Sequence, residues 1–330
     1  MLKIAIIGCG AVARIGHIPA ALGHDKIKIS TLIDKKESYV KELAKELQIK
    51  KYSTDYKEII NDIDAAIIAT PPSSHALIAK ELIQNQKHIL LEKPMAINKE
   101  ECDDIIAAAR QNNTVLGIGF LRRFSLLFNS VKLLLKEQFF GKIKSFEIEQ
   151  GEIYEWPVES EYLYNKEVAG GGVLADSGSH VLDMICWWFG DIKSLEYCDD
   201  NYGGVEANCK IDILMKNDIT GTVKLSRTHN LSNEIIIHCQ KATVKVSIKE
   251  NIIKIKQVNS KYEILGNVAL KGQNENLQTF TDLFSLQMNN WYNAIIKKES
   301  IKVNGEDGQK VVILTQECYN NRKKINFPWL

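Results

Sequence analysis

Two carboxylates and an imidazole stand at helical spacing in the middle of the chain, at Asp176, His180 and Asp183. Residues three or four positions apart share one face of a helix, so these side chains would point to the same side. A histidine beside acids can be held in one tautomer and can exchange protons near neutral pH. The spacing therefore predicts a helix face that performs general acid–base chemistry.

Two other interpretations fit the same segment. Two carboxylates and one imidazole can bind a metal ion, although zinc sites usually include further histidines or thiolates. The acids can also cap the helix and hold a structural histidine. The glycines of Gly170–Gly172, which come just before, allow either backbone or a ligand to approach closely.

A lysine follows an apolar run in the segment Leu90-Leu91-Glu92-Lys93-Pro94. If this run is a parallel strand, Lys93 lies at its carboxyl end, where the ligands of such sheets bind. Lysine at that place can hold a substrate hydroxyl, polarise a carbonyl or share a proton. Pro94 fixes the turn. A solvated lysine at a strand end is the structural alternative.

A glycine loop, Gly8-Cys9-Gly10-Ala11-Val12-Ala13, follows the first apolar run of the chain. In dinucleotide-binding loops, the first glycine permits a tight turn, the second admits the diphosphate, and a small third residue lets the helix pack closely. Backbone N–H groups at the start of that helix face the anion. A tight turn in a cofactor-free α/β protein is the alternative.

Asp34 ends the second apolar run and is suited to bind the ribose hydroxyls of the adenosine. Its carboxylate would repel a 2′-phosphate, so we expect NAD in preference to NADP. Lys35 and Lys36 partly offset that repulsion.

Alternating strands and helices must position these residues in the first part of the chain. Apolar runs and amphipathic stretches take turns, which predicts βαβ units and a doubly wound, mostly parallel sheet in the α/β class. We expect strands near 3–7, 28–33, 65–69, 88–92 and 115–119, and helices near 11–22, 38–47, 74–86 and 98–111.

The pattern changes after Arg123. Helices are expected near 125–136, 176–189, 279–297 and 307–323, and alternating strands near 142–152, 192–199, 205–215, 219–228, 232–239, 242–248 and 251–257. Alternation predicts a mainly antiparallel, open sheet with one packed face. We therefore expect a Rossmann domain over 1–123 and an α+β substrate and oligomerisation domain over 124–330, with the C-terminal helix packing back on the first.

Composition excludes several classes of protein. The 330 residues carry 42 Lys+Arg against 41 Asp+Glu, so no basic excess points to nucleic acid or a membrane surface. No segment approaches the ~20 consecutive apolar residues of a membrane span. The seven cysteines include no CxxC pair, which is typical of buried thiols in a reducing compartment. We expect a cytoplasmic protein.

Together these motifs resemble the Gfo/Idh/MocA family, named after glucose-fructose oxidoreductase and inositol dehydrogenase. The matching pieces are Gly8–Ala13, Asp34, Thr70-Pro71-Pro72 with His75, Glu92-Lys93-Pro94, Gly119–Phe124 and Gly170–Asp183. The resemblance covers the cofactor domain and the start of the second domain. Beyond about residue 200, only the general strand pattern matches.

The resemblance implies oxidation or reduction of a hydroxyl-bearing carbon in a sugar, cyclitol or nucleotide sugar. It implies that Lys93, Asp176 and His180 occupy the catalytic positions, and that Lys93 and Pro94 lie beside the nicotinamide through a cis peptide. Thr70, Pro71, Pro72, His75 and Glu92 would also border the NAD. It further implies a homodimer or homotetramer built through the second sheet.

Substrate recognition is less well defined by the sequence. Lys93, Asp176 and His180 are expected to contact the substrate, and Arg123 and Tyr162 are further candidates. For Arg122 and Arg123 a structural ion pair is an equal alternative. For Tyr162, with its neighbours Trp156 and Tyr164, stacking on a sugar ring competes with a place in the core or at an interface. The run 227–230 reaches the site or forms a turn.

Three functions fit this reading. The first is an NAD-dependent dehydrogenase of a sugar or nucleotide sugar, including a UDP-N-acetyl sugar oxidised at C3. The second is a dehydrogenase of inositol or another polyol. The third is an NAD-binding sensor or scaffold without turnover.

Overall fold

The computed structural model describes residues 1–153, 161–201, 204–250, 252–267 and 279–325. They form two compact units. The first contains Met1–Leu121, Thr279–Ile313 and the described part of Pro157–Gly170. The second contains the described parts of Arg122–Trp156, Gly171–Gln278 and Leu314–Leu330. A division into domains at residue 123 stays a proposal.

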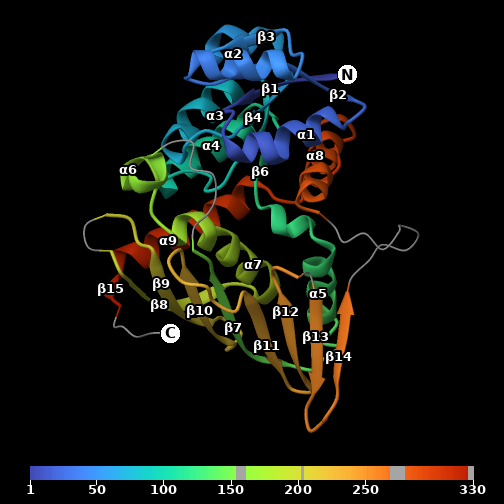
Figure 1. The fold of residues 1–330 in the computed structure, drawn as a ribbon, viewed down its shortest axis with the longest axis vertical. Helices are drawn as coiled ribbons and strands as arrows, with labels where there is room; N and C mark the ends of the chain where they lie inside the picture. The colour runs from blue at the N-terminus through green and yellow to red at the C-terminus, as the bar shows by residue number, and fades with distance from the viewer. Residues whose placement is uncertain (154–160, 202–203, 251, 268–278, 326–330) are drawn as a thin grey trace. The chain divides into compact units, whose positions relative to one another are not determined.

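The first unit is built on a six-stranded parallel sheet in the order β3-β2-β1-β4-β5-β6 (Figure 1). Its central strands β1 and β4 are almost wholly buried, as expected for strands covered on both faces. The doubly wound fold is therefore confirmed. The strands are β1 (Leu2–Ile7), β2 (Ile27–Ile33), β3 (Lys51–Ser53), β4 (Ala65–Ile68), β5 (His88–Leu91) and β6 (Leu116–Ile118). The short, exposed β3 was not predicted.

Helices cover this sheet. The helix after the glycine loop is interrupted by a π-helical turn, Ala13–His17, before α1 (Ile18–Leu22). The other helices are α2 (Glu37–Glu46), α3 (His75–Gln84), α4 (Lys99–Gln111), α6 (Lys166–Ala169) and α8 (Phe280–Ile296), with short 3₁₀ turns at Tyr56–Asp62, Pro72–Ser74 and Glu161–Tyr164.

Helix α8 is distant in sequence but lies beside α1 in the first unit (Figure 1). Its Trp291 is fully buried, and the indole N–H donates to the Ile89 carbonyl at 3.1 Å. The Gln287 amide approaches the Ile118 carbonyl at 3.4 Å. Helix α8 therefore packs beside α1 and against β5 and β6.

The second unit contains a nine-stranded sheet in the order β14-β13-β12-β11-β7-β10-β9-β8-β15. Its pairs are antiparallel except β7 with β10 and β8 with β15, so the expected mainly antiparallel sheet is confirmed. The strands are β7 (Ile143–Gly151), β8 (Ile192–Asp199), β9 (Asn208–Met215), β10 (Thr220–Ser226), β11 (Glu234–Cys239), β12 (Ala242–Ser247), β13 (Ile252–Gln257), β14 (Glu263–Asn267) and β15 (Lys323–Lys324). Strands β14 and β15 were not predicted.

One face of this sheet is packed and the other is open. On the packed face, the Phe146 ring stacks on Phe189 of α7 (Ser179–Phe189) with centroids 4.5 Å apart. A Cβ at Gly221 would lie 2.0 Å from the Phe146 ring, so a glycine is needed there. The open face carries cross-strand ion pairs, including Lys224–Glu149 and His238–Glu147. Helices α5 (Leu126–Lys136) and α9 (Gly305–Asn320) and the 3₁₀ turn Leu121–Phe124 complete the elements.

None of the helices in the described residues is long and apolar enough to cross a membrane. All seven cysteines lie in the described ranges, and none forms a disulfide. Five of the seven are buried, which agrees with the expected buried thiols.

Candidate active site

The glycine loop follows β1 at the carboxyl edge of the first sheet. Gly8 has φ +88°, a conformation that side chains disfavour. A Cβ there would also lie 2.5 Å from the Ala69 carbonyl oxygen at the end of β4. The Gly8 amide donates to the Ile33 carbonyl at 2.8 Å. Gly8 therefore permits the loop to run close to two neighbouring strand ends.

Asp34 shapes this loop directly. One carboxylate oxygen accepts the Cys9 amide at 3.0 Å, and the other accepts the Lys36 amide at 3.0 Å. The Tyr39 hydroxyl donates to the Cys9 carbonyl at 2.6 Å. Carboxylate oxygens have further acceptor positions, so these contacts are compatible with the ribose-binding role, and the preference for NAD over NADP stays a prediction.

The loop fits a dinucleotide diphosphate. Gly10, Ala11 and Val12 lead directly into the helix, where the Arg14 amide donates to the Gly10 carbonyl at 3.0 Å. First-turn N–H groups of a helix lack intrahelical partners and attract anions. The small Ala13 is fully buried, which lets the helix pack closely on the sheet. Gly8, Gly10, Ala11, Val12 and Ala13 would hold the diphosphate.

Lys93 follows β5, at the carboxyl edge of the same sheet. The Lys93 amide donates to the Glu92 carboxylate at 3.1 Å, and the other carboxylate oxygen of Glu92 lies 2.7 Å from Nε2 of His17. Burial acts to raise the pKa of Glu92, but the hydrogen bond and charge of His17, with the charge of Lys93, outweigh burial and lower it. Glu92 is therefore an anion. The peptide from Lys93 to Pro94 is cis, as the resemblance implied.

His75 joins two of the predicted cofactor segments. Its ring nitrogens lie 2.8 Å from the Thr70 carbonyl and 2.9 Å from the Pro94 carbonyl, and the residue is fully buried. Burial lowers the pKa of His75, while both carbonyl contacts oppose that shift. Because carbonyls only accept, the neutral ring donates to one of them and the protonated ring to both. His75 thus ties the 70–72 turn to the Glu92–Pro94 turn.

In the second unit, the glycine run is packed against Glu206. A Cβ at Gly172 would lie 2.0 Å from the Glu206 carbonyl oxygen, and one at Gly171 would lie 2.0 Å from the Tyr319 hydroxyl. The Glu206 carboxylate accepts the amides of Gly172 and Leu174 and the Tyr319 hydroxyl at 2.8–3.0 Å. The close approach of the Glu206 backbone and the Tyr319 side chain therefore explains two of the glycines.

Asp176 and His180 follow this run. Asp176 lies in a π-helical turn, Leu174–Gly178, and His180 lies at the start of α7. The Asp176 carboxylate accepts from Nη2 of Arg227 at 2.8 Å, and both residues are mostly buried. Arg227, which the sequence left undecided between the site and a turn, therefore holds one of the predicted catalytic residues.

Asp183 forms a buried ion pair with Arg123. The guanidinium donates three hydrogen bonds of 2.6–3.1 Å to the carboxylate, and the side chains are 8% and 1% exposed. Arg123 thus adopts the structural alternative considered from the sequence, and its substrate contact stays a prediction.

Arg122 has a different environment. Its Nη2 donates to the Gln150 amide oxygen at 2.6 Å, whereas its buried Nη1 has no hydrogen-bond partner among the described residues. Burial lowers the pKa of Arg122 to about 10, although the charge of Asp183 opposes the shift.

Two predicted residues cannot be placed. The Tyr162 side chain and Trp156 lie outside the residues that the structure describes. Conversely, sequence reasoning missed His17 and Glu206 as site residues. Each is separated from its partner by many residues, so no spacing rule could connect them.

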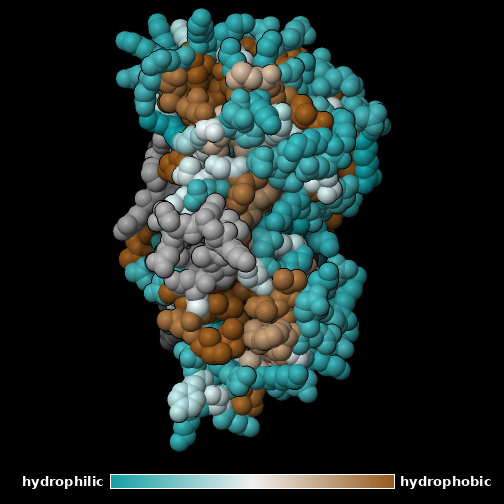
Figure 2. All heavy atoms as spheres, turned by 90° about the vertical axis from the view of Figure 1, so that its right-hand side faces the viewer, coloured by the Kyte–Doolittle hydropathy of each residue, from teal (hydrophilic) through white to brown (hydrophobic). Residues whose placement is uncertain are grey.

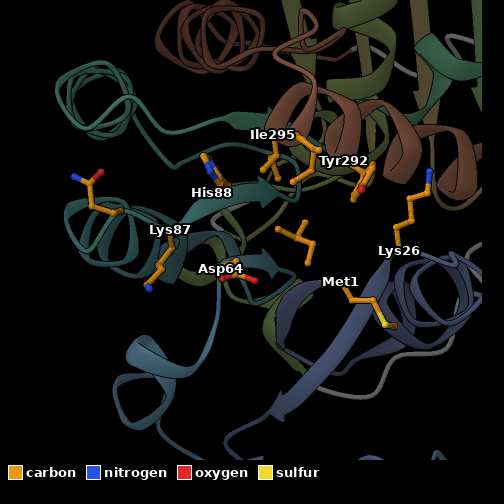
Figure 3. A pocket seen from close by; sticks show the side chains of 10 residues that line it. Met1, Lys26, Asp64, Lys87, His88, Tyr292 and Ile295 are labelled. Atoms are coloured by element: carbon orange, nitrogen blue, oxygen red, sulfur yellow. The ribbon is translucent and has the colours of Figure 1, made fainter.

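A pocket of about 570 Å³ lies at the opposite, amino edge of the first sheet (Figure 3). Leu2 and His88, which begin β1 and β5, line it together with Asp64 and Tyr292. No predicted site residue lines this pocket. We assign the site to the carboxyl edge, because ligands of open parallel sheets bind there.

Two family descriptions match the chain. Residues 2–120 match "Oxidoreductase family, NAD-binding Rossmann fold", and residues 128–245 match "GFO/IDH/MocA C-terminal domain". An oxidoreductase of Formosa agariphila is 28% identical over 224 residues, 66% of this chain and 67% of that protein. A scyllo-inositol 2-dehydrogenase (NAD(+)) of Bacillus subtilis is 26% identical over 256 residues, 71% of each chain. Against two further oxidoreductases, the chain spans only 51% and 53% of their length.

Solved structures share the fold at low identity. Levoglucosan dehydrogenase in complex with NADH and levoglucosan is 19% identical with a TM-score of 0.88, covering 97% of this chain and 96% of that one. The WlbA dehydrogenase from Bordetella pertussis, in complex with NADH and UDP-GlcNAcA, is 18% identical with a TM-score of 0.82, covering 97% and 96%.

We predict that Arg123→Leu destabilises the protein by about 3–5 kcal/mol, because it removes the guanidinium that pairs with the buried Asp183 carboxylate. Arg110→Leu is the matched control: its partner Glu306 and Arg110 itself are largely exposed, so about 1 kcal/mol or less is expected. Urea unfolding measures both. Equal losses of unfolding free energy in the two variants would show that the buried Arg123–Asp183 pair stabilises the protein no more than the exposed pair.

We predict that Glu206→Gln costs about 1–3 kcal/mol, because an amide N–H would face a backbone donor. Burial raises the pKa of Glu206 above its ordinary 4.5, despite the hydrogen bonds from Leu174 and Tyr319. The folded protein therefore binds this proton more tightly, and the contribution of Glu206 to stability falls as pH rises from 4.5 through its folded pKa.

The stability difference between wild type and Glu206→Gln should accordingly shrink or turn against the wild type over that pH range, in urea unfolding at several pH values. Glu196→Gln, at an exposed carboxylate paired with Lys323, is the control without this trend. If the stability difference between wild type and Glu206→Gln did not change with pH, the raised pKa of Glu206 would be contradicted.

Proposed function

Because the chain belongs to the Gfo/Idh/MocA family of NAD-binding oxidoreductases, we propose that it transfers a hydride between NAD and a hydroxyl-bearing carbon of a sugar or nucleotide sugar. The observation that carries this proposal is the position of Lys93. Its turn is tied through Glu92 and His17 to the helix that follows the dinucleotide loop. A lysine so placed suits a reaction on a carbon that faces the cofactor.

In this mechanism the protein handles the proton. NAD, when bound, supplies the acceptor for the hydride that leaves the carbon. His180 accepts the proton of the hydroxyl, and Lys93 stabilises the developing negative charge on that oxygen. Asp176, held by Arg227, orients the substrate or Lys93. Asp183 anchors the helix of His180 through its ion pair with Arg123.

The substrate class is proposed from the relatives and from Arg122. The similar proteins include an inositol dehydrogenase and structures with levoglucosan or a UDP-sugar acid. Arg122 offers a buried N–H group that suits a carboxylate or phosphate, which favours a nucleotide sugar such as a UDP-N-acetyl sugar. An inositol or other polyol is the second candidate. A cytoplasmic enzyme suits these substrates and the cysteine usage.

We also propose a homodimer or homotetramer built through the second sheet. Large apolar side chains of that unit are exposed, among them Leu133 on α5 and Leu265 on β14. Figure 2 faces the side of α5 and β14 and shows apolar atoms among hydrophilic ones there. Burying such a surface against a second copy would remove it from water.

Light scattering tests the assembly. We expect a mass of two or four times 37.3 kDa, and a lower mass for Leu265→Asp because the charge would be buried. Ile296→Asp, at an exposed position of α8 in the first unit, should leave the mass unchanged. A monomeric wild type would refute the proposal.

We predict that His180→Ala and Lys93→Ala each lower kcat by about 10²–10⁴-fold, because each removes a positioned proton-transfer or charge-stabilising group. The Kd for NAD, followed by tryptophan fluorescence, should change little for His180→Ala. His238→Ala and Lys87→Ala, a histidine on the open sheet face and a lysine at the opposite sheet edge, are matched controls that should keep wild-type kcat.

Near-wild-type kcat in both catalytic variants, with a verified substrate, would refute this assignment. Quenching of fluorescence by NAD without oxidation of any tested UDP-sugar or polyol would instead favour the third function, an NAD-binding sensor or scaffold.

A further inference from the structure

His17 and Glu92 form a buried pair that takes no part in the proton and hydride transfer proposed above. His17 Nε2 lies 2.7 Å from a Glu92 carboxylate oxygen, and the side chains are 1% and 9% exposed. His17 comes from the π-helical turn after the dinucleotide loop, and Glu92 directly precedes Lys93. The pair therefore joins the element that would bind the cofactor to the residue that would contact the substrate.

The second oxygen of Glu92 passes this contact to the Lys93 backbone. It accepts the Lys93 amide at 3.1 Å. On the other side stands Gly119, where a Cβ would lie 2.8 Å from the same oxygen. The carboxylate is thus confined between His17, the Lys93 amide and Gly119, and can move little from this position.

The imidazole of His17 is also held in place. The ring of Phe284, from α8, meets it edge-on with centroids 4.8 Å apart. A Cβ at the neighbouring Gly16 would lie 2.4 Å from the Phe284 ring, so this helix and α8 are in close contact. Packing against α8 therefore also fixes the position of His17.

The far side of the turn has its own support. His75 contacts the Pro94 carbonyl at 2.9 Å and is fully buried. The backbone around Lys93 is accordingly held on both sides, by Glu92 with His17 before it and by His75 after it. Without His17, the anionic Glu92 would keep its burial but lose its charge-assisted hydrogen bond, which favours protonation or displacement of the carboxylate.

We propose that His17 is a positioning residue for Lys93: through the Glu92 carboxylate, it fixes the Lys93 backbone relative to the helix that follows the dinucleotide loop. This inference rests on the proposed function, in which Lys93 contacts the reacting oxygen. It assigns His17 no contact with substrate.

Three variants test the proposal. His17→Leu removes the donor and introduces an apolar side chain of similar size. His17→Gln keeps an N–H donor at a similar reach and serves as the conservative rescue. Glu92→Gln keeps the volume but removes the charge. His24→Leu is the matched control, since His24 lies just after α1, contacts Tyr292 and accepts the Lys26 amide.

Two readouts are needed, one of them independent of turnover. The first is amide hydrogen exchange, by mass spectrometry, of the peptide covering residues 88–97 in the full-length protein without substrate. The second is the separation of kcat from the Kd for NAD. We expect faster exchange and a fall in kcat of about 10- to 100-fold in His17→Leu and Glu92→Gln. The Kd for NAD should be nearly unchanged in His17→Leu. His17→Gln should restore both readouts, and His24→Leu should match the wild type.

Several results would overturn the inference: wild-type exchange in His17→Leu, no recovery in His17→Gln, or an equal loss in His24→Leu. If His17→Leu fails to fold, the same readouts are compared between Glu92→Gln and His17→Gln. Wild-type exchange in Glu92→Gln would then overturn the inference. If the wild type turns over no tested substrate, the proposed function fails, while the exchange comparison still supports or refutes the positioning of Lys93.

Discussion

A carboxylate buried away from water is costly unless hydrogen-bond donors surround it, and this constraint orders both units of the protein. In the first unit, Glu92 is satisfied by His17 and by the Lys93 amide. In the second, Glu206 is satisfied by two backbone amides and Tyr319, and Asp183 by Arg123. Each acid lies within a few residues of, or binds directly to, a segment that carries predicted chemistry.

The three acids act on different parts of the site. Glu92 fixes the turn that presents Lys93. Glu206 fixes the glycine run from which the helix of Asp176 and His180 begins, and Asp183 anchors that helix to Arg123. The residues proposed for catalysis are therefore held in place by ion pairs and hydrogen bonds of other side chains. Those side chains have no part in the proposed proton transfer. Precise placement of this kind is what a positioned proton transfer requires.

Much of the fold was predictable because its signals are local. The buried strands β1 and β4 appear as continuous apolar runs, and the sheet of the second unit appears as alternating runs. The strands that were missed, β3, β14 and β15, are short, exposed or at a sheet edge, so they carry little hydrophobic pattern. The position of α8 beside α1 could not be predicted, since no local pattern records which distant elements pack together.

The sequence by itself determined the types of the chemical groups and their place along the chain: the glycine loop, Asp34, Lys93 after a strand, and Asp176 with His180 on a helix. Tertiary structure alone decided which groups pair. In the structure, Arg123 rather than Arg122 forms the ion pair with Asp183, and Arg227 donates to Asp176. His17 contacts Glu92, which lies 75 residues away in the sequence. The physical reason is that motifs record local backbone geometry, whereas the partner of a buried charge depends on the packing of elements that are distant in sequence.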